Sequence, residues 1–168
     1  MPHPYEAERE TLEDDTHTTL LEGRTILPGA QTLFGFQLSA LFTAAFREQL
    51  STTDRYVHFA SLALNAAAIA VLMFPAAYHR QVIPGVVSRN FVAMVGRTMT
   101  VALAFVGASL SSTMFLVCDL VFDSRVAAAV GAGVASTTFV VLWFIWPRFA
   151  RRNRTRQELE AERTSAHD

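Results

Sequence analysis

Hydrophobic residues in this chain form four long runs that contain no Asp, Glu, Lys or Arg. The runs cover residues 26–46, 57–77, 98–118 and 126–146. As an α-helix, a run of this size is about 31 Å long, which matches the hydrocarbon core of a bilayer. The pattern therefore predicts an all-α fold, a membrane four-helix bundle.

Polar and helix-breaking residues divide the rest of the chain. Pro28 begins the first run, Pro84-Gly85 marks a turn between the second and third, and Pro147 follows the last. We expect an acidic arm over 1–25 that is loosely ordered, a transmembrane domain over 26–147 and an Arg-rich tail over 148–168. The third helix is expected to extend back toward Phe91, so that Arg97 lies in its first turns.

The distribution of arginine predicts the orientation, because positive charge near the ends of spans is retained on the cytoplasmic side. With both termini in the cytoplasm, only Arg47, Arg55 and Arg125 of the 14 basic residues lie on the other side. We therefore expect a multi-pass protein of the inner membrane with cytoplasmic termini. The Arg-rich tail is expected to contact anionic lipid.

Composition excludes several classes of protein. Hydrophobic residues make up 51% of the chain and charged residues 17%, which disfavours a soluble globular domain. A net charge of −1 argues against a nucleic-acid partner, and a single cysteine, Cys118, permits no internal disulfide. His58 and His79 lie at opposite membrane faces, so we expect no metal site, no cofactor and no enzymatic activity.

Polar side chains within the spans fall into three layers by depth. Polar groups in a bilayer need partners, so these positions are the candidate functional residues. The middle layer comprises Gln37, Asn65, Ser109 and Ser136. The outer polar face comprises His58, Ser61, Ser112 and Asp119. The inner layer comprises Gln31, His79 and Arg97.

Two interpretations of these layers stay open. His58, Ser61 and Asn65 share one helical face, and Ser112 and Asp119 share another, so the two faces together would form a polar half-channel open to the outside. In the simpler interpretation, Asn65 and Gln37 bond across helices, His58 lies among headgroups and Asp119 caps a helix end in water.

Small residues on the last span offer two packing stripes. Ala127, Gly131 and Ala135 form one stripe, and Ala129, Gly133 and Thr137 form its neighbour. Small residues let membrane helices approach closely. We expect these stripes to pack within one bundle, and the alternative is that one of them forms a subunit interface.

The segment Arg24-Thr-Ile-Leu-Pro-Gly-Ala-Gln-Thr-Leu-Phe-Gly-Phe-Gln37, together with Pro75-Ala-Ala-Tyr-His-Arg80, resembles a family of small bacterial integral-membrane proteins of unknown function. The resemblance covers residues 20–147 and implies four spans. Some members are automatically labelled sodium:proton antiporters. Antiport uses a carboxylate near mid-membrane, and the middle layer of this chain has none.

The leading functional hypothesis is a small transport or permeation protein, because the uncharged middle layer lies beside the face of His58, Ser61 and Asn65. We expect a homo-oligomer, since four spans enclose little room for a pathway. The alternative is a membrane accessory protein that transports nothing and binds a partner or anionic lipid through its cytoplasmic arms.

Overall fold

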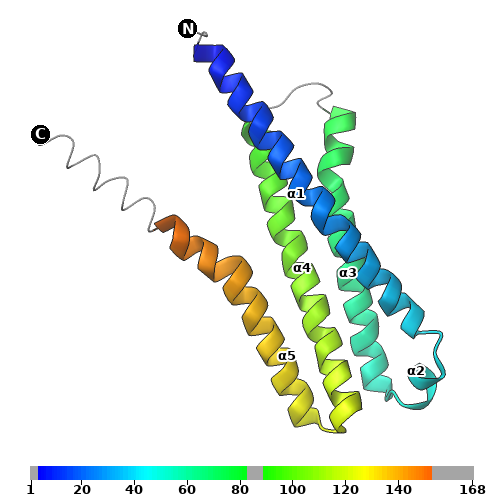
Figure 1. Ribbon diagram of the computed structural model, residues 1–168. Helices are drawn as coiled ribbons and strands as arrows, with labels where there is room; N and C mark the ends of the chain where they lie inside the picture. The colour runs from blue at the N-terminus through cyan, green and yellow to red at the C-terminus, as the bar shows by residue number, and fades with distance from the viewer. Residues whose placement is uncertain (1–3, 83–88, 153–168) are drawn as a thin grey trace, which may run out of the picture.

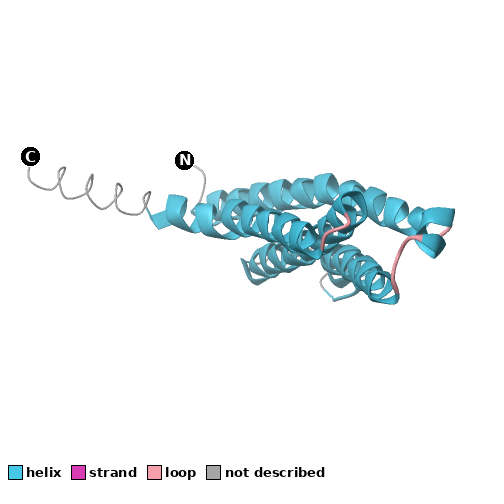
Figure 2. Ribbon diagram, turned by 90° about the horizontal axis from the view of Figure 1, so that it is seen from below, coloured by secondary structure: helices cyan, strands magenta, loops and turns pink. Residues whose placement is uncertain are grey.

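The computed structural model describes residues 4–82 and 89–152, and every regular element within these ranges is a helix. Figures 1 and 2 show long helices joined by short loops. The elements are α1 (Pro4–Ala40), α2 (Ala44–Glu48), α3 (Thr52–Val82), α4 (Arg89–Phe122), α5 (Arg125–Val140) and the π-helical turn η1 (Val141–Ile145), after which the helical backbone continues to residue 152. The predicted all-α class is confirmed.

Among the residues that the structure describes, three helices are long and apolar enough to cross a membrane, which indicates a membrane protein. They cover Thr52–Val82, Asn90–Phe122 and Arg125–Arg152, and they contain the second, third and fourth predicted spans. α4 begins at Arg89, so Arg97 lies near its start, as expected.

The first predicted span, 26–46, differs from the other three. α1 ends at Ala40, and the next three residues form a turn in which Leu41, Phe42 and Thr43 donate to carbonyls three residues back. The part of α1 after residue 25 is therefore about 22 Å long, shorter than a bilayer core. α1 is not among the candidate spans, so three of the four predicted spans are supported by the described residues.

The acidic arm also differs from its prediction. We expected residues 1–25 to be loosely ordered, but the backbone is helical from Pro4 and continues without a break into the apolar part of α1. The sequence has no Gly or Pro between Pro4 and Gly23, and it is rich in Glu and Leu, which favour helices. Residues 1–3 and the tail beyond residue 152 lie outside the described residues.

Helix packing corrects the predicted four-helix bundle. α1, α3 and α4 contact one another, whereas α5 packs mainly against α4. Figure 1 shows α5 close to α4 at the α4–α5 loop and diverging from the bundle toward its other end. The chain is therefore a three-helix bundle with a fourth helix docked on one side.

Small side chains line the centre of this bundle. Ala30, Ala68 and Val106 come from α1, α3 and α4 and form one buried cluster. Short side chains at this contact let the three backbones approach, which favours dispersion contacts and interhelical hydrogen bonds in lipid. The bundle centre can therefore hold polar side chains that reach from one helix to the next.

The two small-residue stripes of α5 have different surroundings. Gly131 faces α4 so closely that a Cβ atom added there would lie 2.5 Å from Cys118 Sγ. Gly133 has open space at the same position, and its neighbours Ala129 and Thr137 are exposed. The first stripe thus packs on α4, and the second lies on the surface.

The π-helical turn η1 has a local cause. Pro147 has no N–H, and in a regular α-helix its ring would clash with the carbonyl of Trp143. The preceding backbone widens instead, and the Trp146 N–H donates to the Val141 carbonyl five residues back. The extra residue rotates the following helical segment relative to α5.

Candidate functional site

A group of polar side chains fills the interface between α1, α3 and α4. Five of its members are no more than 6% exposed: Gln37, His58, Ser61, Asn65 and Ser109. This group, here called the polar cluster, comprises Gln37, His58, Ser61, Asn65, Ser109 and Thr113.

The Gln37 amide is the centre of the polar cluster. Its Nε2 donates to the hydroxyls of Ser61 at 2.8 Å, Ser109 at 3.0 Å and Thr113 at 3.0 Å. Two amide hydrogens thus serve three acceptors. One side chain of α1 therefore bonds to α3 and α4 at once.

Backbone carbonyls accept the hydroxyl hydrogens of the polar cluster. Ser61 Oγ donates to the Ser109 carbonyl at 2.8 Å, and Ser109 Oγ donates to the Ser61 carbonyl at 2.9 Å. Thr113 Oγ1 donates to the Ser109 carbonyl of its own helix at 3.0 Å. The hydroxyls also lie close to one another, since Ser61 Oγ is 3.1 Å from Ser109 Oγ and 3.0 Å from Thr113 Oγ1, and either atom of each pair can donate.

Asn65 extends the polar cluster deeper into the bundle. Its Nδ2 donates to the Ala30 carbonyl at 3.1 Å and to Gln37 Oε1 at 3.3 Å. Asn65 Oδ1 is buried and has no hydrogen-bond partner among the residues that the structure describes. The cluster therefore has a single open acceptor, at its inner end.

His58 closes the other end of the polar cluster. Its Nε2 lies 2.9 Å from the Gln37 carbonyl, and because a carbonyl only accepts, Nε2 carries the hydrogen. That carbonyl is one of the last four of α1, which lack partners within the helix. The His58 ring also packs edge-on against Phe46 of α2, with centroids 5.0 Å apart. His58 therefore caps α1 where the helix stops.

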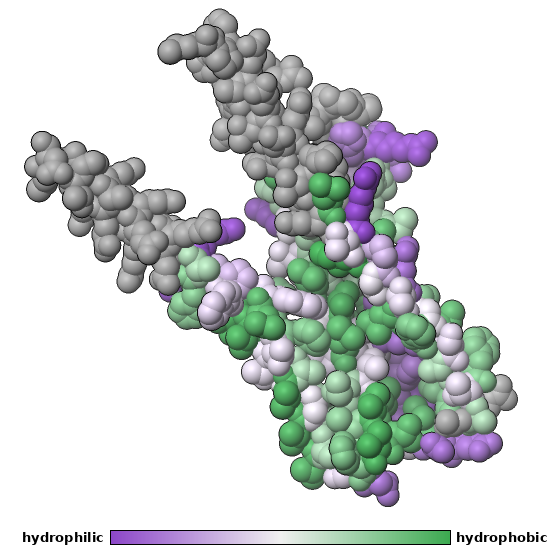
Figure 3. Space-filling view, viewed as in Figure 1, coloured by the Kyte–Doolittle hydropathy of each residue, from purple (hydrophilic) through white to green (hydrophobic). Residues whose placement is uncertain are grey.

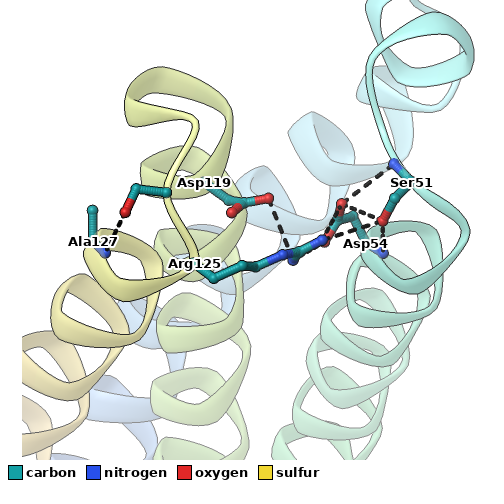
Figure 4. A network of polar contacts seen from close by, with 6 residues as sticks. Ser51, Asp54, Asp119, Arg125 and Ala127 are labelled. Carbon is teal, nitrogen blue, oxygen red and sulfur yellow. Dashed lines mark hydrogen bonds and ion pairs between the residues drawn. The ribbon is translucent and has the colours of Figure 1, made fainter.

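A second polar group ties α3, α4 and α5 together at the end of the bundle near the α4–α5 loop (Figure 4). Arg125 Nη1 lies 2.6 Å from Asp54 Oδ1, and Nη2 lies 3.2 Å from Oδ2, which gives a bidentate pair. Nη1 also lies 3.3 Å from Asp119 Oδ2. Arg125 thus fixes the start of α5 relative to both neighbouring helices.

Asp54 has a second role at the start of α3. The Asp54 N–H donates to Ser51 Oγ, and the Ser51 N–H donates to Asp54 Oδ2, each at 3.3 Å. This reciprocal pair is a capping box. A polar cavity of about 450 Å³ opens beside it, lined by Gln49, Leu50, Asp54, Leu116, Asp119, Leu120 and Asp123.

The structure brings together some of the predicted middle layer and outer face. Gln37, Asn65 and Ser109 meet in the polar cluster, where His58 and Ser61 join them. Ser136 is instead exposed on α5. The face of α3 that carries His58 contacts Ser109 and Thr113. Ser112 bonds to Ala108 of its own helix, and Asp119 pairs with Arg125.

The simpler of the two interpretations was partly right. Asn65 and Gln37 do bond across helices, as it states. Its placement of His58 among headgroups is wrong, because His58 is 6% exposed and bonds to α1. Asp119 was predicted to cap a helix end in water, and the structure shows it as an ion-pair partner of Arg125.

The predicted inner layer is dispersed among its helices. Gln31 on α1 and Arg97 on α4 are exposed. His79 is half-buried, and its ring lies 5.2 Å from that of Phe91. Within the described ranges, no three histidine, cysteine or carboxylate side chains gather as a metal site requires.

Thr113 and Asp54 are site residues that were not predicted from the sequence. Thr113 lies four residues after Ser109, so helical spacing places both on one face. Asp54 lies four residues before His58 and three after Ser51, which is the spacing of a capping box. Both signals are local, but their significance depends on which faces meet in the bundle.

Comparison with known proteins gives a family without an assigned activity. A family described as a family of unknown function (DUF6328) matches residues 5–147. No curated protein and no solved structure matches the chain. The match covers the part of the chain that holds the polar cluster, the first two apolar helices and most of the third. The chain therefore belongs to this family of unknown function.

Proposed function

We propose that this protein is a non-enzymatic accessory protein of the inner membrane that conducts nothing through its own bundle. The observation that supports this proposal is how completely the buried side chains of the polar cluster bond to one another and to the backbone. The Gln37 amide bonds to all three hydroxyls, and each hydroxyl has a backbone carbonyl within hydrogen-bond distance. The cluster therefore joins α1, α3 and α4, which supports a structural role for its side chains.

The carboxylates near the bundle also support a role other than ion transport. An exchange site for cations needs an acid whose charge can be bound and released within the membrane. Asp54 and Asp119 lie near the α4–α5 loop and share one guanidinium, that of Arg125. Their charges thus form ion pairs that join α3 and α4 to the start of α5.

The proposal includes an orientation with both termini in the cytoplasm. Arg148, Arg151 and Arg152 extend from α5 at one end of the bundle, while Arg125 lies at the other end. Excess arginine favours the cytoplasmic side. A protease-accessibility assay on tags at each terminus tests this orientation, and periplasmic tags would contradict it.

The accessory role assigns binding to the two cytoplasmic arms. Deletion of residues 1–22 and 152–168 leaves the polar cluster intact, since its members lie between residues 37 and 113. We expect the truncated protein to keep its helicity in detergent but to lose any membrane partner that copurifies with the full chain. Equal recovery of that partner with both forms would contradict the role of the arms.

We predict that the purified protein passes no protons or Na⁺ in liposomes. Full-length protein is reconstituted with a pH- or Na⁺-sensitive dye trapped inside, and an ion gradient is imposed. The expected signal equals that of protein-free liposomes, because the side chains of the polar cluster are buried and bonded to one another. An added ionophore supplies the positive control. A flux that rises with the amount of protein would overturn the proposal.

The second candidate is permeation between subunits of a homo-oligomer. Two observations favour it: Asn65 Oδ1 has no partner among the described residues, and the exposed stripe around Gly133 borders a surface hollow of about 600 Å³. A mass measurement in detergent tests this candidate together with the liposome assay. An oligomer that conducts favours permeation, whereas a silent monomer excludes it.

A further inference from the structure

The helical stretch that runs from η1 to residue 152, here called the distal segment, carries a hollow that the polar cluster does not explain. Its volume is about 510 Å³, and the described residues that line it are Ile145, Arg148, Phe149, Arg151 and Arg152. Figure 1 shows that α5 diverges from α4 toward this end, and Figure 3 shows the same segment standing apart from the body of the molecule. The hollow therefore lies beside the distal segment, at the end of the helix that is farthest from the bundle.

Helical spacing puts apolar and basic residues on one face of the distal segment. Ile145, Arg148, Phe149 and Arg152 occupy positions i, i+3, i+4 and i+7, which share a face of a helix. The π-helical turn before Pro147 adds a residue and so changes the direction in which this face points. The π-helical turn η1 thus contributes to the direction in which Arg148 and Arg152 point.

The lining combines the two chemistries of a charged lipid. Guanidinium groups bind phosphate through paired N–H donors, while the long stem of arginine covers apolar surface. Ile145 and Phe149 supply an apolar wall between the basic residues. Trp146 is 68% exposed beside them, and tryptophan is typical of the membrane interface. A soluble phosphate would use the arginines alone and leave the wall without a partner.

We propose that this hollow binds an anionic phospholipid. The phosphate lies against Arg148 and Arg152, and an acyl chain lies along Ile145 and Phe149. Surface charge alone attracts such lipids without placing them, but a basic face joined to an apolar hollow holds one at a defined position. The inference rests on the membrane location in the proposed function and is independent of whether the bundle conducts.

The two tryptophans of the chain, Trp143 and Trp146, make the site measurable without a label. Full-length protein is reconstituted in phosphatidylcholine vesicles that contain a small fraction of brominated phosphatidylglycerol or, in parallel, of brominated phosphatidylcholine. Bromine quenches tryptophan only at short range. We expect stronger quenching by the brominated phosphatidylglycerol at equal mole fraction.

The variant Arg148→Gln/Arg152→Gln tests the assignment of the headgroup. Each arginine near an anionic surface contributes roughly a fivefold gain, so the pair predicts about a 25-fold loss of preference for phosphatidylglycerol. Arg80→Gln/Arg97→Gln is the matched control, because it removes the same charge from exposed residues outside the hollow. Arg148→Lys/Arg152→Lys is expected to keep most of the preference.

Three outcomes would overturn the proposal. They are equal quenching by the two brominated lipids, the same loss in both glutamine variants, and abolition of the preference by millimolar inorganic phosphate, which would identify a free anion as the ligand. Vesicles that conduct ions while keeping the lipid preference would contradict only the proposed function. Silent vesicles without the preference would contradict only the lipid site.

Discussion

Replacing Gln37 by leucine is expected to lower the free energy of unfolding by about 2–3 kcal/mol, because the variant removes bonds to two other helices at once. Gln37 contacts Ser61, Ser109, Thr113 and Asn65. An interhelical hydrogen bond in a membrane protein contributes roughly 0.6 kcal/mol, and a polar group left without its partner adds to the loss. Unfolding in mixed detergent micelles, followed by circular dichroism, measures the difference.

Gln31→Leu is the matched control for this prediction. Gln31 is exposed on the same helix, so its replacement is expected to change the unfolding free energy by less than about 0.5 kcal/mol. If the two variants lose stability equally, or if Gln37→Leu is as stable as the native chain, the polar cluster does not hold the bundle together.

Replacing Gly131 by leucine is expected to separate α5 from α4. A Cβ at this position meets Cys118 Sγ at 2.5 Å and Cys118 Cβ at 3.4 Å, so a larger side chain forces the helices apart at a cost of about 1–3 kcal/mol. Cys118 is the single cysteine of the chain and reports this directly. We expect it to react faster with N-ethylmaleimide in the Gly131→Leu variant than in the native protein.

Gly133→Leu supplies the control, because a Cβ there meets nothing within 4 Å. Its Cys118 is expected to react at the native rate. Faster reaction in both variants would mean that added bulk anywhere on α5 loosens the helix, and an unchanged rate in Gly131→Leu would contradict the close contact with α4.

Much of the helical architecture was predictable from hydrophobic runs alone. The runs over 57–77, 98–118 and 126–146 lie within α3, α4 and the helix that begins at Arg125, because apolar segments of this length have few alternatives to a helix in lipid. The first run, 26–46, did not predict where the helix ends, since α1 stops at Ala40. The chain turns at Leu41 although its neighbours are apolar, and the bond from His58 to the Gln37 carbonyl is a tertiary contact that no local pattern shows.

Several residues of the polar cluster could be predicted from the sequence, but the bonds that they make could not. Depth along the spans grouped Gln37, Asn65 and Ser109 correctly, since equal depth is a condition for contact. Ser136 shared that depth and still lies on the surface, because the face of α5 that contacts α4 carries Gly131 and Phe139 instead. Which hydroxyls and carbonyls meet depends on how the three helices pack, and no local pattern in the sequence shows that.

Access of a charged thiol reagent to Ser109 tests the closed interface most directly. Ser109→Cys and, as a reactive control, the exposed Thr53→Cys are each made in a Cys118→Ala background. Membrane fragments open on both sides are treated with a membrane-impermeant, positively charged methanethiosulfonate. A closed cluster predicts that Thr53→Cys is modified while Ser109→Cys reacts only after denaturation. Modification of Ser109→Cys in the folded protein would show that water and ions reach the centre of the bundle, which contradicts the account.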